Sequence, residues 1–216
     1  MMCRKNYLIV FISCLLFLLP TLAHAEIFYI MPRLGLNVAL GEKGRVSGNT
    51  GNVLEPEGTS ATFIASLAGG VHFSRIPIRF ELDISFRTDA RMRDSIGSDS
   101  ITTKLYQLAP MINVYYDIYI PNFALVPYIG VGIGFTTFFA DTSAVIGVER
   151  YTADALASID FTWGVMAGMT FPVDRFLIDF SFRFTDAGKA KVASKGLSGN
   201  VRVMNFDFLL GIRFPL

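Results

Sequence analysis

The stretch FALVPYIGVGIGFTTFF, Phe123 to Phe139, decides the fold because three glycines stand there at alternate positions, Gly130, Gly132 and Gly134. Successive side chains of an extended strand point to opposite faces, so one face here is almost bare backbone and the other is an apolar ridge. Glycine is disfavoured in strands, so something must compensate for it. We therefore predict one wall of a transmembrane β-barrel, with the glycines facing a crowded interior.

The N-terminus has the pattern of a secretory signal peptide. Two basic residues precede the apolar run Tyr7 to Leu19, Pro20 ends the run, and Ala23-His24-Ala25 fits a small-x-small cleavage site. About 13 apolar residues are too few to span a bilayer. We predict that residues 1–25 are a cleaved signal peptide and that residues 26–216 form one domain.

The mature chain offers little for catalysis or cofactor binding. The only cysteines, Cys3 and Cys14, lie in the predicted signal, which leaves neither a disulfide nor a thiolate metal site. Removal of Arg4 and Lys5 with the signal takes the formal net charge from +1 to −1, which gives no reason to expect a nucleic-acid partner. His72 is the sole histidine after the signal, with Ser74 or Ser85 as nominal nucleophiles. We expect no enzyme activity, no metal and no cofactor, with a lipid-modifying hydrolase or acyltransferase as an alternative.

Alternation of apolar and polar residues recurs along the mature chain. The segments that separate the alternating stretches are long and short by turns. The four long ones are polar and cover residues 41–59, 89–100, 141–156 and 186–200. Short turns on one side and long loops on the other are typical of outer-membrane barrels. We predict an all-β, eight-stranded antiparallel up-and-down barrel that displays four external loops, with strands at 26–40, 60–73, 78–87, 103–117, 123–139, 159–171, 176–185 and 205–216.

Residue size indicates which face points outward. Eight inward rows of Phe, Ile and Leu would overfill an eight-stranded barrel, whose interior is just wide enough for side chains. The polar rows are thin, and within the predicted strands lysine occurs only at Lys104, whereas a water-facing surface normally carries many charges. We therefore expect the apolar rows to face lipid. The alternative is a soluble periplasmic barrel with an apolar ligand cavity.

The inward rows contain charges of both signs. Buried charges must be paired, which predicts a salt-bridged plug, while a narrow porin lined by the same charges is the alternative. We expect the inward glycines to make room for bulky groups such as Tyr29, Arg33 or Tyr115. The predicted charge network comprises Arg33, Arg79, Glu81, Asp83, Arg87, Asp179, Arg183, Asp207 and Arg213.

Two further features lead to expectations. Lys189, Lys191 and Lys195 lie in the last polar segment and form a possible binding patch for acidic glycans or lipopolysaccharide phosphates, although such clusters are most often solvated loops. Pro32 and Pro110 fall inside predicted strands and cannot donate ladder hydrogen bonds. We expect a bulge or a late strand start at each proline.

The segments NVYYDIYI, Asn113 to Ile120, and VPYIGVGIGF, Val126 to Phe135, resemble the strand-turn-strand signature of the opacity-protein and OmpA-like eight-stranded outer-membrane barrels, closest to the rickettsial type of surface antigen. The resemblance implies surface exposure, adhesion or immune recognition, sometimes porin-like activity, and no shared catalytic residues.

The expected location is the bacterial outer membrane. The expected partners are outer-membrane lipid and lipopolysaccharide, the barrel-insertion machinery, and a host receptor or glycan, with the protein itself a monomer. The chain ends in Leu216, whereas the family's assembly signal ends in an aromatic residue.

Overall fold

The computed structural model describes residues 26–48, 53–54, 58–73, 76–96, 99–146, 149–194 and 197–216. The predicted signal peptide and Lys195 lie outside these ranges. Within the described ranges, no helix has both the length and the apolar character needed to cross a membrane.

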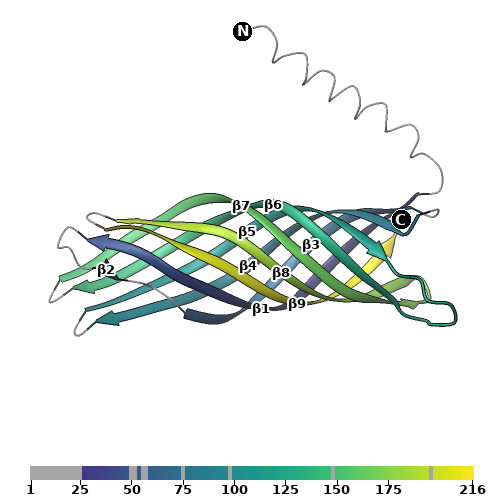
Figure 1. Cartoon of the computed structure of the whole chain (residues 1–216), viewed down its shortest axis with the longest axis horizontal. Coiled ribbons are helices and arrows are strands. Elements are labelled where there is room, and N and C mark those ends of the chain that lie inside the picture. The colour runs from purple at the N-terminus through teal and green to yellow at the C-terminus, as the bar shows by residue number, and fades with distance from the viewer. Residues whose placement is uncertain are drawn as a thin grey trace, which may run out of the picture.

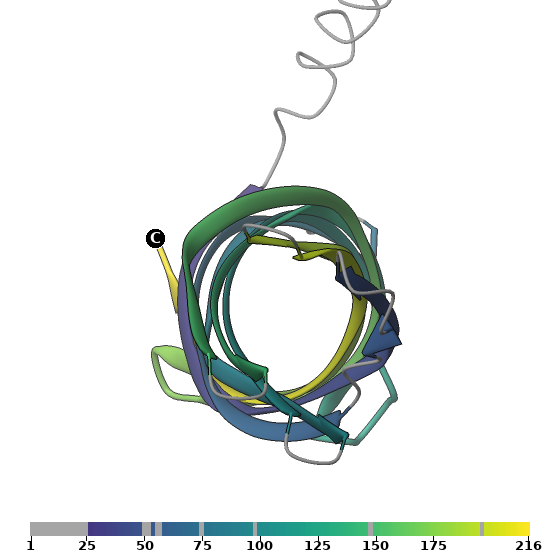
Figure 2. The same cartoon turned by 90° about the vertical axis from the view of Figure 1, so that its left-hand side faces the viewer.

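Eight long strands close into an antiparallel barrel, which confirms the predicted fold class (Figures 1 and 2). Each strand pairs with the next along the chain, and the first pairs with the last to close the ring. A two-residue strand, β2 (Val53–Leu54), adds to the end of β1. The barrel strands are β1 (Glu26–Gly48), β3 (Gly58–Phe73), β4 (Ile78–Ile96), β5 (Asp99–Asp117), β6 (Val126–Ile146), β7 (Glu149–Val173), β8 (Phe176–Ser194) and β9 (Leu197–Pro215).

The two ends of the barrel differ. One end, here called the turn end, carries the short connections and both ends of the barrel domain, Glu26 and Leu216 (Figure 1). Its turns place Asn122 and Asp174 at positive φ, 61° and 48°, a conformation that Asn and Asp tolerate better than most residues. The opposite end, here called the hairpin end, carries the connections β1–β3, β4–β5, β6–β7 and β8–β9.

The prediction of four long loops is wrong, because the strands continue through most of those segments. Pairing runs out to Ile96↔Asp99 between β4 and β5, to Ile146↔Glu149 between β6 and β7, and to Ser194↔Leu197 between β8 and β9. A strand loses its alternating pattern where it no longer has one lipid face, although its backbone hydrogen bonds can continue. The polar composition therefore concealed these strand extensions.

The expectation for the two prolines is also wrong. Pro32 and Pro110 lie inside continuous strands, and neither causes a register shift. Instead, the β1–β9 pairing skips Met31 and Pro32, and the β5–β6 pairing skips Ala109 and Pro110, before both resume in the same register. A missing N–H interrupts the ladder toward one neighbour only. The interruption is local in both strands.

In two pairs of neighbouring strands, the hydrogen-bonded ladder ends before it reaches the hairpin end. The β3–β4 pairing ends at Ile64↔Arg87, and the β7–β8 pairing ends at Trp163↔Asp186. From there to the hairpin end, we call the unpaired region between β3 and β4 the β3–β4 seam and the unpaired region between β7 and β8 the β7–β8 seam.

Side chains bridge both seams in place of the ladder. The Thr88 hydroxyl accepts from the Phe63 N–H at 3.0 Å and donates to the Phe63 carbonyl at 3.3 Å. Asp160 and Ser158 accept from the N–H groups of Lys189 (2.7 Å) and Lys191 (3.1 Å).

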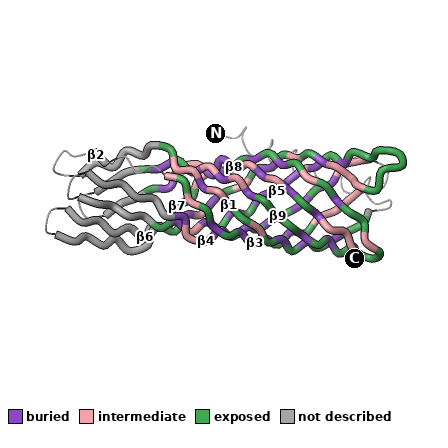
Figure 3. The backbone as a smooth tube through the Cα atoms, turned by 90° about the horizontal axis from the view of Figure 1, so that it is seen from below, coloured by how far each residue is buried: buried purple, intermediate pink, exposed green. Residues whose placement is uncertain are grey.

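The outer wall is apolar, as the alternation predicts. Exposed and buried residues alternate along the strands, and outward side chains such as Leu34 and Phe63 are 69% and 68% exposed (Figure 3). Outward aromatic rings pack across neighbouring strands, for example Trp163 on Phe184 at 5.8 Å between centroids. The soluble-barrel alternative is inconsistent with this arrangement, because it requires the apolar rows to point inward.

Candidate functional site in the barrel lumen

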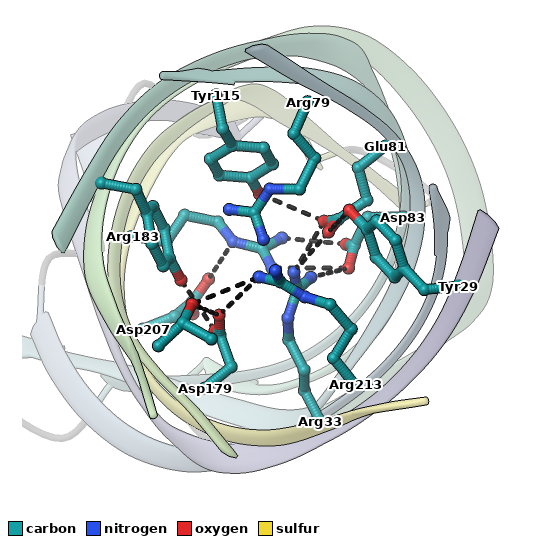
Figure 4. A network of polar contacts seen from close by, with 12 residues as sticks. Tyr29, Arg33, Arg79, Glu81, Asp83, Tyr115, Asp179, Arg183, Asp207 and Arg213 are labelled. Carbon is teal, nitrogen blue, oxygen red and sulfur yellow. Dashed lines mark hydrogen bonds and ion pairs between the residues drawn. The ribbon is translucent and has the colours of Figure 1, made fainter. Parts of the chain in front are cut away.

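Ten arginine and carboxylate side chains fill the middle of the lumen, and Figure 4 shows most of them together with two of the tyrosines beside them. Among the described residues, five arginines face five carboxylates, and none of the ten is more than 7% exposed. Alternation along each strand directs these side chains inward, because they share the parity of the buried rows. The layer comprises Arg33, Arg79, Arg87, Arg183, Arg213, Glu81, Asp83, Asp117, Asp179 and Asp207.

Arg33 and Arg183 bind the carboxylates of β4 at the centre of the layer. Arg33 on β1 donates to both oxygens of Glu81, at 2.7 and 2.8 Å, and to Asp83 at 2.8 Å. Arg183 on β8 donates to the other oxygen of Asp83 at 2.9 Å. Because Asp83 bridges two arginines from β1 and β8, it ties strands on different sides of the barrel together.

Asp207 on β9 plays the same bridging role one step nearer the hairpin end. Arg87 donates to its two oxygens at 3.1 and 2.6 Å, and Arg183 lies 3.9 Å away. The Asn37 amide donates to Asp207 at 2.7 Å. The network then continues toward the hairpin end through Asn205, which exchanges hydrogen bonds with Gln107.

Arg79 is held differently. Its side chain is fully buried, and none of its three nitrogens makes a hydrogen bond. The guanidinium lies over the rings of Tyr115 and Tyr128, at 4.4 and 4.6 Å from the centroids, in a cation–π arrangement. Its nearest carboxylate is Asp117, at 3.5 Å. Tyrosine faces therefore carry much of the compensation for this buried charge.

The arrangement contains participants that the sequence reasoning missed. Asp117 was not assigned to the charge network, although it shares the parity of Asn113 and Tyr115 and could have been found from that parity. The hydroxyls of Tyr29 and Tyr115 donate to Glu81, at 3.0 and 3.1 Å. The nine residues of the predicted network all lie in the lumen; eight of them pair directly with one another, and Arg79 is held by Asp117 and by tyrosine rings.

The three glycines of β6 lie on the lumen side. A Cβ at Gly130 would meet the Tyr115 ring at 2.3 Å, and one at Gly132 would meet Asn113 Oδ1 at 2.0 Å. At Gly134 the obstacle is the backbone carbonyl of Pro110, 2.1 Å away.

Glycines on other strands accommodate Tyr29 and Arg33. The Tyr29 ring lies over Gly70, and the Arg33 stem lies over Gly211. The room that was expected from the β6 glycines therefore serves only Tyr115 among the three residues considered.

On the side of the hairpin end, a second layer of buried side chains fills the lumen, and this layer is apolar. Along β1 the inward residues run from Arg33 through Asn37 to Ala39, and along β9 from Asp207 through Asn205 to Val203. Each layer is packed, but only the first is charged. The apolar layer comprises Ala39, Ala90, Leu105, Phe138, Ala187, Ala190, Val201 and Val203, none more than 2% exposed.

The remaining candidate residues are spread over the molecule. Lys189 and Lys191 are exposed on β8, beside Arg202 of β9, which pairs with Asp186. His72 Nε2 lies 2.9 Å from the Tyr119 hydroxyl, whereas Ser85 donates to the Ala109 carbonyl. Histidine and serine thus have separate partners, and Ser74 lies outside the described residues. Across the described ranges, no group of three or more His, Cys, Asp or Glu side chains could hold a metal ion.

A closed antiparallel barrel with an apolar wall and a charged interior defines the class of outer-membrane β-barrels. Solved structures share this fold. A major outer membrane protein from Thermus thermophilus matches with a TM-score of 0.52 at 13% identity, and the match covers 89% of this chain and 100% of that one.

Two further structures match with lower TM-scores. Neisserial surface protein A matches with a TM-score of 0.48 at 16% identity (88% of this chain, 97% of that one). The N-terminal barrel of Pseudomonas aeruginosa OprF matches with 0.36 at 10% identity (84% and 96%).

In sequence, the family described as "Surface antigen" matches residues 87–147. That segment includes both stretches on which the resemblance to surface antigens rests, and the match confirms the resemblance. No curated protein matches the chain. The chain is thus an outer-membrane β-barrel protein that is similar to surface antigens.

Proposed function

We propose that the protein is a surface protein of the bacterial outer membrane, in which a sealed barrel anchors a hairpin end that contacts other cells or host molecules. The observation that carries the proposal is the filled lumen, with a charge-balanced layer followed by an apolar layer. A barrel filled in this way stabilises the wall and leaves the ends to make contacts. We propose no enzymatic activity and a monomeric state.

The filled lumen speaks against the narrow porin. Conduction requires ions to enter and leave, and here paired charges and a packed apolar layer occupy the path. Planar-bilayer recordings of the refolded protein should show no channel events, and Arg79→Ala should destabilise the barrel without opening it. Discrete unitary currents in the wild type that increase in Arg79→Ala would support the porin instead.

Orientation is tested by labelling single cysteines. The mature chain is free of cysteine if residues 1–25 are removed, so Lys191→Cys at the hairpin end and Asp174→Cys at the turn end form a matched, exposed pair. A membrane-impermeant maleimide should label Lys191→Cys on intact cells and should label Asp174→Cys only after lysis. Labelling of Asp174→Cys alone on intact cells would reverse the orientation, and labelling of neither would refute surface display.

Contact with an acidic glycan is supported by Lys189 and Lys191, which project from the same face of β8. A non-adherent bacterium that expresses the protein should attach to cultured epithelial cells, and soluble heparin should compete. The double variant Lys189→Glu/Lys191→Glu should reduce attachment, while Lys104→Glu, an exposed lysine on β5, serves as control. Equal attachment with and without the protein would contradict adhesion.

Assembly and the lipid environment complete the proposal. We infer that the barrel-insertion machinery assembles the exported chain and that outer-membrane lipid, including lipopolysaccharide where it is present, covers the apolar wall. The C-terminal strand supports this because it is paired into the ring on both sides, and the Leu216 N–H donates to the Phe28 carbonyl at 2.8 Å.

A further inference from the structure

A small cavity opens at the turn end of the lumen, beyond the charged layer. Its volume is about 230 Å³, and both polar and apolar side chains line it. The residues that matter for binding are Asp117, Tyr119, His72, Arg213, Val126 and Leu177. A cavity of this size accommodates a molecule of roughly ten non-hydrogen atoms.

The two buried charges that line the cavity lie on opposite walls. Asp117 ends β5 and Arg213 lies on β9. In the ring, three barrel strands separate β5 from β9 in either direction. The cavity is therefore acidic on one side and basic on the other.

Both charged groups retain hydrogen-bonding capacity that the plug does not use. Asp117 is 3% exposed and its Oδ1 makes no hydrogen bond, since Arg79 and His72 lie 3.5 and 3.8 Å from its carboxylate. Arg213 donates to Asp179 at 3.0 Å, but its Nε has no partner. These two atoms are closed off from the cavity, so a ligand meets the parts of the two side chains that remain exposed, 4% of Asp117 and 8% of Arg213.

The side wall adds a hydroxyl and apolar surface. Partial burial and the nearby Asp117 carboxylate raise the pKa of the Tyr119 hydroxyl, which lies 2.9 Å from His72 Nε2. Val126 and Leu177 present aliphatic groups to the same space. A ligand that fits carries a positive group, a negative group and a small apolar group.

We propose that this cavity binds an α-amino acid with an aliphatic side chain. The ammonium group pairs with Asp117, the carboxylate pairs with Arg213, and the side chain packs against Val126 and Leu177. A zwitterion adds no net charge to a lumen whose charges are balanced, whereas a simple anion or cation adds one uncompensated charge. The site does not depend on adhesion at the hairpin end.

The test uses three matched probes on the refolded protein in micelles, where both ends of the barrel are accessible. L-leucine carries both charges, 4-methylpentanoate lacks the ammonium group, and isoamylamine lacks the carboxylate. Titration followed by amide resonances of Tyr119 and His72 should show that leucine binds about tenfold or more tightly than either half-ligand, because each removes one charge-assisted contact. Equal affinities, or no saturable shift with leucine, would overturn the proposal.

Two variants locate the site. Val126→Trp fills the cavity and should abolish the leucine response, whereas Ile129→Trp, on the lipid-facing side of the same strand, should retain it. Asp117→Asn should reduce leucine affinity to that of 4-methylpentanoate. Retention of leucine binding in Val126→Trp would refute this location, and that comparison decides the question even if Asp117→Asn does not refold.

Discussion

The charged layer and the apolar layer lie in the same barrel but are stabilised by different interactions. Arg33, Asp83 and Asp207 are stabilised by partners that must all be present, whereas Phe138 and Val203 are stabilised by shape and by removal from water. Both layers sit on the inward parity of the strands. Strand parity therefore fixes which side chains are buried, and the neighbouring strands decide whether the buried layer is polar.

The largest effect is expected in the charged layer, at Asp207. Asp207→Ala removes the carboxylate that Arg87 and Arg183 share and leaves both guanidinium groups short of a partner. Loss of one partner from a buried pair costs about 3 to 5 kcal/mol. The shift of unboiled protein on gels after urea incubation measures the folded fraction. Asp174→Asn in an exposed turn is the control, and equal urea midpoints for the two variants would contradict the bridging role.

The apolar layer should respond somewhat less, through cavity formation. Phe138 is fully buried, and Phe138→Ala should lower the free energy of unfolding by about 3 kcal/mol. Its neighbour Phe139 points outward and is 37% exposed, so Phe139→Ala opens no internal cavity and should cost clearly less. The same urea titration compares the two variants. A larger loss at Phe139 would show that the layer at the hairpin end is not a packed core.

Two glycines of β6 differ in what they face in the lumen, because Gly134 faces backbone and Gly132 faces a side chain. Gly134→Ala places a methyl group against the Pro110 carbonyl, which is backbone, whereas Gly132→Ala meets the end of the Asn113 side chain, which can rotate. Overpacking costs about 1 to 3 kcal/mol, and we expect Gly134→Ala to lie at the upper end of that range. Refolding yield into micelles is the measurement, with Val131→Leu on the lipid face as control. Greater damage from Gly132→Ala would mean that Asn113 is held firmly.

Much of this fold follows from the sequence, and the failures have a common cause. Arg33, Glu81 and Asp207 were predicted to point inward because lipid on one side of a strand imposes a strict alternation. Around Ala187 and Ala190 the residues no longer alternate strictly between apolar and polar. The sequence there therefore predicted a loop, although β8 and β9 remain paired.

The specific side-chain contacts in the lumen could not be predicted from the sequence of each strand alone. Asp83 meets Arg183, and Arg79 meets Tyr128, across strands that are not adjacent in the ring. Such pairs depend on register and barrel closure, which no single strand encodes. The cavity at the turn end has the same origin, since its acidic and basic walls come from opposite strands.

The smallest effect is expected at the β3–β4 seam, where one side chain replaces a ladder. Thr88→Val keeps the branched shape but removes the hydroxyl that bonds both the N–H and the carbonyl of Phe63. The loss should be about 1 kcal/mol, because Phe63 lies at the wall and not in the lumen layers. Amide exchange should accelerate at Phe63 while the amides of Asp83 and Asp207 keep their protection. Faster exchange throughout the charged layer would show instead that the seam and the plug open together, so that the two layers are one cooperative unit.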